Sequence, residues 1–203
     1  MAAEVNLFKN NFVFGVVARA VNGEGVNGDA YLIKLWGSHV LIALIDGLGH
    51  GVDAALASTE AKKFVEEHFE TDIGDIMLGL HEYLRKTRGA VVGLARIDQA
   101  EKKFSYCGVG NIEIQVLSEP PMHPTSLEGV VGMNMIRIKK FEYHYNSLKF
   151  AVLYSDGISS TFDLPSDQRF IEPQKTAEFI LNECGSRLDD ATVIIAMKKA
   201  TKG

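Results

Sequence analysis

The stretch that decides the fold is Val-Leu-Ile-Ala-Leu-Ile-Asp-Gly-Leu-Gly-His-Gly, residues 40–51. Its apolar run ends at Asp46, and glycines then stand at alternate positions before an alanine-rich segment. A continuous apolar run bounded by glycine predicts a strand that is buried on both faces. Such a strand fixes the aspartate at its end, and the glycine lets a ligand approach the backbone. The pattern half repeats at residues 150–157, which end in Ser155-Asp156-Gly157, so one metal centre built from two distant parts of the chain is indicated.

Length and composition indicate one globular domain, residues 1–203, with 46% apolar and 23% charged residues. The net charge of −5 argues against general nucleic-acid binding. The two cysteines form no CxxC pair, which disfavours a zinc ribbon or a disulfide scaffold and favours a reducing, cytoplasmic location. We find no secretion-signal pattern and no apolar run of membrane-spanning length. A membrane partner is therefore not expected.

Apolar periodicity divides the chain into strands and helices of the α+β class, with short turns that favour antiparallel pairing. We expect strands at residues 12–20, 30–36, 39–45, 90–97, 103–108, 112–117, 133–138, 141–145, 148–154 and 192–197. We expect helices at residues 52–69, at residues 173–184, and from the N-cap Asp72 to about residue 87. The proline-containing segment 119–132 predicts an irregular surface loop.

Several aspartates stand at the expected strand ends, where a sheet would gather them at one edge: Asp29, Asp46, Asp156, Asp189 and Asp190. Carboxylates collected in this way repel one another, and a divalent cation relieves the repulsion. Oxygen ligands without histidine or cysteine select Mg²⁺ or Mn²⁺, and two ions could share one carboxylate. A lone Asp-Gly step is usually a turn, but this combination favours a metal site.

The glycine-rich segment after Asp46 has a second interpretation, because it follows a strand and opens a helix. Dinucleotide-binding loops share this context, but their fingerprint needs glycine or alanine where Val52 stands. The glycines fit better as a bend that lets a substrate approach the metals. His50 is either an exposed loop residue or a hydrogen-bonding group behind the ligands.

Six short motifs occur in a fixed order between residues 28 and 192: Gly28-Asp29, Asp46-Gly47-Leu48-Gly49-His50-Gly51, Arg88-Gly89-Ala90, Gly108-Val109-Gly110-Asn111, Ser155-Asp156-Gly157 and Asp189-Asp190-Ala191-Thr192. This set resembles the metal-dependent serine/threonine protein phosphatases of the type 2C (PPM) family, in the short SpoIIE-like bacterial branch. The resemblance implies a four-layer α-β-β-α sandwich, in which two antiparallel sheets are flanked by helices.

The resemblance also implies a role for each acidic residue. Asp46 would bridge two Mn²⁺ or Mg²⁺ ions, and the Gly47 carbonyl would bind one of them. Asp156 and Asp189 would bind the other ion, although Asp190 is adjacent to Asp189 and competes for this assignment. Asp29 would hold metal-bound water. The catalytic residues would then be Asp46 and Asp29.

The implied reaction is hydrolysis of phosphoserine or phosphothreonine by a water that bridges the two ions. The implied substrates are phosphorylated STAS-domain scaffold and antagonist proteins of bacterial stress signalling, the stressosome. An inactive module that only binds such partners is the main alternative, and a hydrolase of a small phosphoester is another. The concentration of mutually repelling carboxylates favours the active enzyme.

The sequence departs from the family pattern where the larger family often carries a phosphate-binding arginine. Glu24 stands there instead, so the phosphate would be held mainly by the metals or by a basic residue that the sequence does not identify. The chain also lacks room for an inserted flap subdomain. Substrate choice is therefore expected to come from the surface near residues 120–132 and 157–169.

Overall fold

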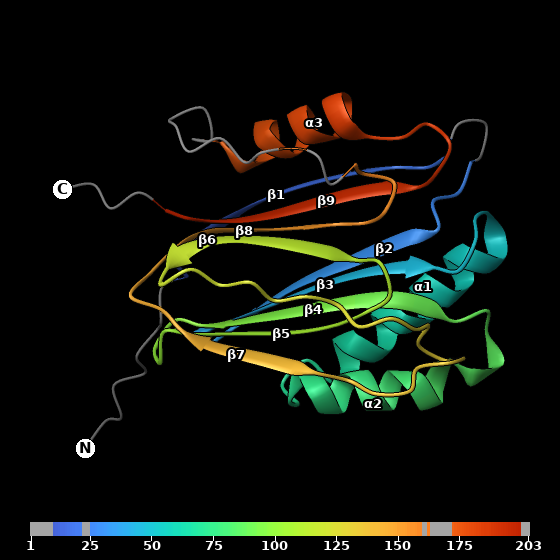
Figure 1. The fold of residues 1–203 in the computed structure, drawn as a ribbon. Coiled ribbons are helices and arrows are strands. Elements are labelled where there is room, and N and C mark those ends of the chain that lie inside the picture. Colours follow the sequence, from blue (N-terminus) through green and yellow to red (C-terminus); the bar gives the residue numbers. More distant parts are fainter. Residues whose placement is uncertain (1–9, 22–24, 160–161, 163–171, 200–203) are drawn as a thin grey trace, which may run out of the picture.

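The computed structural model is a sandwich of two antiparallel sheets whose outer faces are covered by helices (Figure 1). The structure describes residues 10–21, 25–159, 162 and 172–199. Within these residues the chain forms nine strands, three α-helices and one short 3-10 helix. The expected α-β-β-α architecture is therefore confirmed.

One sheet has four strands in the order β1-β9-β8-β6, and the other has five in the order β2-β3-β4-β5-β7. The strands of the first sheet are β1 (Phe12–Arg19), β9 (Ala191–Lys198), β8 (Ser147–Tyr154) and β6 (Glu113–Glu119). Those of the second are β2 (Asp29–Trp36), β3 (His39–Gly47), β4 (Ala90–Asp98), β5 (Lys103–Val109) and β7 (Lys140–His144). The helices are α1 (Val52–Glu67), α2 (Ile73–Tyr83), η1 (Leu84–Lys86) and α3 (Pro173–Cys184).

Strand β3 shows why its sequence reads as an unbroken apolar run. Side chains alternate between the two faces of a strand, and both faces of β3 are buried. One set packs between the two sheets: Val40, Ile42 and Leu44. The other set packs in the layer formed with α1 and α2: Leu41, Ala43 and Ile45. A third buried cluster joins the four-stranded sheet to α3, so the four layers enclose three apolar interfaces.

The expected strand at residues 133–138 is wrong. The segment has no strand pairing; Met133 is 58% exposed and Ile136 is 94% exposed. The Asn134 side chain accepts a hydrogen bond from the Val130 amide at 2.8 Å, and the Asn134 amide donates to the Val130 carbonyl at 3.1 Å. These two bonds fold the segment into a turn. The second helix is also shorter than expected, because α2 ends at Tyr83 and the chain continues as η1.

Candidate metal centre

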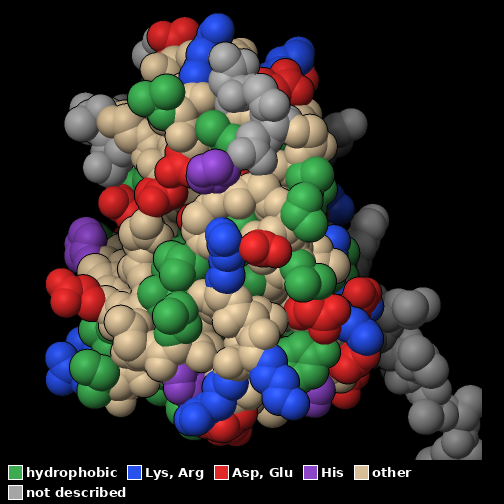
Figure 2. Space-filling model, turned by 90° about the vertical axis from the view of Figure 1, so that its right-hand side faces the viewer, with side chains coloured by type: hydrophobic (Ala, Val, Ile, Leu, Met, Phe, Trp, Pro, Cys, Tyr) green, Lys and Arg blue, Asp and Glu red, His purple; other side chains and the backbone are tan. Residues whose placement is uncertain are grey.

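The aspartates singled out by the sequence all lie at strand ends on one end of the sandwich. Asp29 begins β2 and Asp46 is the penultimate residue of β3, so both belong to the five-stranded sheet. Asp156 follows β8, and Asp189 lies just before β9, in the four-stranded sheet. Figure 2 faces this end of the molecule and shows acidic side chains gathered beside a histidine. Carboxylates of both sheets therefore meet at one edge.

Asp46 lies at the centre of this group. It is mostly buried, and it pairs directly with Asp29 in the β2–β3 ladder. Burial raises the pKa of Asp46 to about 9, and the charges of Asp29, Asp156 and Asp189 add to the effect. Asp46 is thus a carboxyl group that binds a proton unless another positive charge replaces it.

Asp29 pairs with Asp46 on the neighbouring strand. One of its carboxylate oxygens has a hydrogen-bond partner and the other has none. Its Oδ2 accepts a hydrogen bond from the Ser155 hydroxyl at 2.8 Å, whereas its buried Oδ1 has no hydrogen-bond partner. Burial raises the pKa of Asp29 to about 7, although the side chains of Thr192 and Ser155 act in the opposite direction. A buried acceptor without a partner is costly. Asp29 therefore retains the capacity to bind a cation or a water molecule.

A cavity of about 220 Å³ opens in front of these residues, and its lining includes three of the aspartates: Asp46, Asp156 and Asp189. Burial raises the pKa of Asp156, and the charge of Asp189 raises it further. The Asn111 side-chain amide donates a hydrogen bond of 2.5 Å to Asp156 Oδ2 and orients that carboxylate. Leu48 and Leu188 supply apolar parts of the wall.

The adjacent residues Asp189 and Asp190 have different environments. Asp190 is 2% exposed, and its two oxygens accept hydrogen bonds from the amides of Val21 and Gly28, each at 2.9 Å. Both of its oxygens are thus used to attach the segment before β2 to the start of β9. Asp189 instead lines the cavity. Of the two residues, Asp189 is therefore the one at the surface of the cavity.

Gly47 is required by close packing between β3 and α1. A β-carbon at this position would lie 2.0 Å from the backbone carbonyl oxygen of Ala54. The next residues form the bend expected from the sequence, since Gly49 and Gly51 have positive φ angles of 86° and 78°. The absence of a side chain at Gly47 brings the beginning of α1 against the end of β3, next to Asp46.

The donor set fits a hard divalent cation in its chemistry. It consists of carboxylate oxygens, which hard divalent cations prefer. The pKa values of two of these carboxyl groups, Asp29 and Asp46, are strongly raised, and Asp29 Oδ1 is buried without a hydrogen-bond partner. Among the described residues, however, no three acidic, histidine or cysteine side chains already form a group that could hold an ion by themselves. Backbone oxygens and water would have to complete the coordination of any ion bound there.

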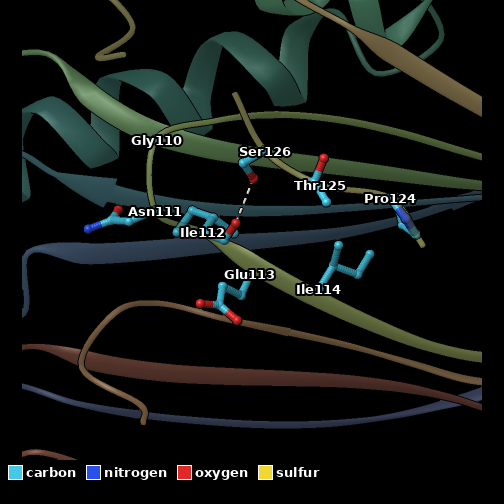
Figure 3. A pocket seen from close by; sticks show the side chains of 8 residues that line it. All are labelled: Gly110, Asn111, Ile112, Glu113, Ile114, Pro124, Thr125 and Ser126. Atoms are coloured by element: carbon cyan, nitrogen blue, oxygen red, sulfur yellow. Dashed lines mark hydrogen bonds between the residues drawn. The ribbon is translucent and has the colours of Figure 1, made fainter. Parts of the chain in front are cut away.

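A larger cavity of about 320 Å³ lies next to this one and shares Asn111 with it. Figure 3 shows it between the start of β6 and the Pro124–Ser126 segment, where the Ser126 hydroxyl donates to the Ile112 carbonyl at 2.6 Å. The acidic side chain in its lining is Glu113, whose carboxylate accepts a hydrogen bond of 2.7 Å from the Tyr154 hydroxyl. The aspartates therefore gather at the smaller cavity and not at the larger one.

The sequence matches the family model described as Stage II sporulation protein E (SpoIIE) over residues 37–199. The chain belongs to the SpoIIE family. This confirms the resemblance stated from the motifs, and the matched region includes Asp46, Asp156 and Asp189.

Individual relatives of this SpoIIE-family protein agree with the assignment. It is 25% identical over 180 residues to the phosphoserine phosphatase RsbX of Bacillus subtilis (strain 168), covering 85% of this chain and 88% of RsbX. A structure reported in work on the bacterial stressosome as a modular system is 30% identical, with a TM-score of 0.85, and the match covers 92% of this chain and 100% of that one. A crystal structure of RsbX in complex with magnesium is 23% identical, with a TM-score of 0.82 over 94% of this chain and 98% of that one, and so shares the fold.

Sequence reasoning considered Asp190 only as an alternative ligand to Asp189 and gave no role to Ser155. In the structure these two residues, with Asn111, hold the acidic residues and the segment before them in place. The motifs contained all three, but only the folded chain shows which atoms they contact. The described residues do not include Glu24. They also do not include residues 160–161 and 163–169 of the segment expected to influence substrate choice. In the described part of the SpoIIE-family chain, no helix combines the length and apolarity needed to cross a membrane.

Proposed function

We propose that this protein is a metal-dependent phosphatase that hydrolyses phosphoserine or phosphothreonine in other proteins. The observation that carries the proposal is the cavity in which Asp46, Asp156 and Asp189 meet, with Asp29 directly behind Asp46. A site that only binds a protein partner gains nothing from mutually repelling carboxylates with raised pKa values. Two Mg²⁺ or Mn²⁺ ions explain why the chain collects them.

Each residue has a role in this proposal. Asp46 would help to hold both ions from its central position, the Gly47 carbonyl would hold one, and Asp156 and Asp189 would hold the other. Asp29 holds water through its unpartnered oxygen, while Ser155 fixes its orientation. When bound, the ions supply positive charge for the phosphate and lower the pKa of a water molecule, so that it serves as the nucleophile.

The relatives support a protein substrate in bacterial stress signalling. RsbX is named a phosphoserine phosphatase, and the structural match at 30% identity comes from a study of the stressosome. We propose phosphorylated STAS-domain scaffold and antagonist proteins as the substrates. We also propose that the protein acts in the cytoplasm, since Cys107 and Cys184 are both free thiols.

The deciding experiment measures phosphate release from phosphoserine and phosphothreonine peptides and from a phosphorylated STAS-domain protein. The assays contain Mn²⁺ or Mg²⁺, or a chelator. We expect release that requires the metal and that falls by roughly a hundredfold or more in Asp46→Asn, because a bridging carboxylate is lost. Asp75→Asn, at an exposed carboxylate in the first turn of α2, is the matched control and should retain the wild-type rate.

Two results would separate the proposal from its alternatives. Tight binding of the phosphoprotein without any release of phosphate would identify an inactive binding module. Rapid hydrolysis of small phosphoesters combined with no activity on phosphoproteins would identify a small-molecule hydrolase. Activity that survives complete chelation would contradict the metal mechanism itself.

A further inference from the structure

The proposed reaction needs a group that attracts a phosphate dianion to an acidic cavity. The described residues that line the cavity include no lysine or arginine. The acidic side chains repel an anion, and the position before the first motif, where the larger family often has an arginine, holds Glu24. A basic side chain that borders the cavity from another element would supply the missing charge.

Arg88 occupies such a position. It lies between η1 and β4, and the carbonyl of the following residue, Gly89, accepts a hydrogen bond of 3.1 Å from the Leu48 amide. This bond holds the Arg88 segment against the glycine-rich bend. Nη1 of Arg88 lies 3.2 Å from the place that a β-carbon on Gly49 would occupy. Gly49 lines the cavity, so the guanidinium lies next to a residue of the cavity wall, although Arg88 itself does not line the cavity.

The other end of the guanidinium contacts α1. Nη2 of Arg88 forms an ion pair with Asp53 Oδ2 at 3.2 Å, and the two side chains are 51% and 65% exposed. Exposed pairs of this kind add little to stability, because water screens the attraction. The pair is therefore weak enough to leave the guanidinium available to a phosphate, and Nη1 lies on the side of Gly49. A guanidinium presents several N–H donors in one plane, which suits it to bind two oxygens of a phosphate.

We propose that Arg88 binds the phosphate of the substrate at the rim of the metal cavity, where phosphate would compete with Asp53 for the guanidinium. This inference rests on the proposed function and extends it, because it names the residue that recognises the phosphomonoester dianion. A side chain at Gly49 would crowd this guanidinium, since its β-carbon would lie 3.2 Å from Nη1.

The test compares Arg88→Ala, Arg88→Lys and Asp53→Asn in the metal-loaded full chain. Steady-state rates on a phosphoserine peptide give kcat and KM, and calorimetry gives the affinities for inorganic phosphate and for Mn²⁺. We expect Arg88→Ala to weaken phosphate affinity and raise KM by roughly tenfold to a hundredfold, while Mn²⁺ affinity is unchanged. Arg88→Lys should recover part of the loss, because it restores the charge but not the planar donor pair.

Asp53→Asn distinguishes a phosphate-binding role of Arg88 from a purely structural one. If Arg88 only fastens α1 to the start of β4, removing either partner of the ion pair will have the same effect. If Arg88 binds phosphate, Asp53→Asn will leave phosphate affinity at the wild-type level or above it, because a competing carboxylate charge is lost. Arg85→Ala is the matched control, since Arg85 lies in η1 and pairs with Glu82 at 2.8 Å.

The inference is overturned if Arg88→Ala leaves both KM and phosphate affinity unchanged, or if Asp53→Asn weakens phosphate affinity as much as Arg88→Ala does. It is also overturned if phosphate affinity is lost in Arg187→Ala and not in Arg88→Ala. Arg187 is the basic residue next to Leu188 of the cavity wall. The calorimetric measurement does not need turnover. A wild-type protein that binds phosphate through Arg88 but releases none from phosphoproteins would refute the proposed function and leave this inference standing.

Discussion

Asp29 lies directly opposite Asp46 in the antiparallel ladder of β2 and β3. A pair of like charges facing each other across two strands is unfavourable, and here both carboxyl groups are also removed from water. The strand register therefore builds a local cost into the metal-free protein that a bound cation would remove.

Asp46→Asn should make the metal-free protein more stable. Asparagine keeps the shape of the side chain but removes a buried charge or the need to bind a proton, which we expect to raise the free energy of unfolding by about 1–3 kcal/mol at neutral pH. Urea unfolding in the presence of a chelator measures the difference. Mn²⁺ should then stabilise the wild-type protein but not the variant. A variant less stable than the chelated wild type would contradict the account.

Asp189→Asn and Asp190→Asn should affect different properties of the protein, metal binding in the first case and stability in the second. Asp190 accepts two backbone N–H groups in a buried position, so its replacement should lower the free energy of unfolding by about 1–3 kcal/mol. Asp189→Asn should leave stability nearly unchanged and weaken Mn²⁺ binding. Chemical unfolding and metal titration of both variants measure these effects. If Asp190→Asn alone impairs metal binding in the folded state, the assignment of Asp189 is wrong.

Ser155→Ala should damage both folding and metal binding. The buried Ser155 hydroxyl donates to Asp29 Oδ2 and accepts the Thr192 amide at 2.9 Å, so alanine leaves that N–H without its partner. We expect a loss of about 1–3 kcal/mol in the free energy of unfolding, together with weaker Mn²⁺ binding. Ser118→Ala is the control, because the Ser118 hydroxyl bonds the Pro120 carbonyl at the surface. Equal stability of the two variants would refute the bridging role.

Gly47→Ala should be far more disruptive than Gly25→Ala. A β-carbon at Gly47 would meet backbone atoms of Ala54, which cannot move without shifting α1, whereas a β-carbon at Gly25 would have nothing within 4 Å. We expect the first substitution to cost about 1–3 kcal/mol of stability and the second to be close to neutral. Thermal unfolding of both variants measures this contrast. Similar melting temperatures would show that the helix does not press against the strand end.

The stability supplied by Asp72 should disappear at low pH. Partial burial alone would raise the pKa of this α2 N-cap, but hydrogen bonds from Lys140 and Gly74 outweigh it and lower the pKa below its ordinary value. A lowered pKa in the folded state means that the contribution is present above the unfolded pKa and is lost as the pH falls through the folded one. Asp72→Asn should therefore be less stable than the wild type by about 1 kcal/mol at pH 7, and the gap should close as the pH falls through the lowered pKa of Asp72. A gap that does not depend on pH would exclude the ionised form as its source.

The sequence was most informative where one pattern had one physical explanation. The apolar run before Asp46 had to be a strand buried on both faces, and Asp72 could be recognised as an N-cap from its position alone. The segment 133–138 has a composition typical of a strand, but nothing in the sequence shows that a strand partner is missing. Met133 and Ile136 are exposed around the Asn134 turn instead, while Met135 and Ile138 pack against the core beside α2.

The site was predicted in part, for a related reason. Strand ends could be assigned from local patterns, so the four acidic positions were found. The choice between Asp189 and Asp190 could not be made, because it depends on contacts with Val21 and Gly28, which are far away in the sequence. Arg88 stood in a quoted motif without a role, since only the folded chain places its guanidinium beside Gly49.

The two sheets are joined at the acidic end by hydrogen bonds that involve no ion. Ser155 links β8 to Asp29 of β2, and Asp190 holds the Gly28 amide at the start of the same strand. Hydrogen bonds of the chain itself therefore hold this end of the sandwich together. Under the proposed metal mechanism, removing the cation would stop catalysis without unfolding the chain, so the supply of free cation would set the fraction of active protein.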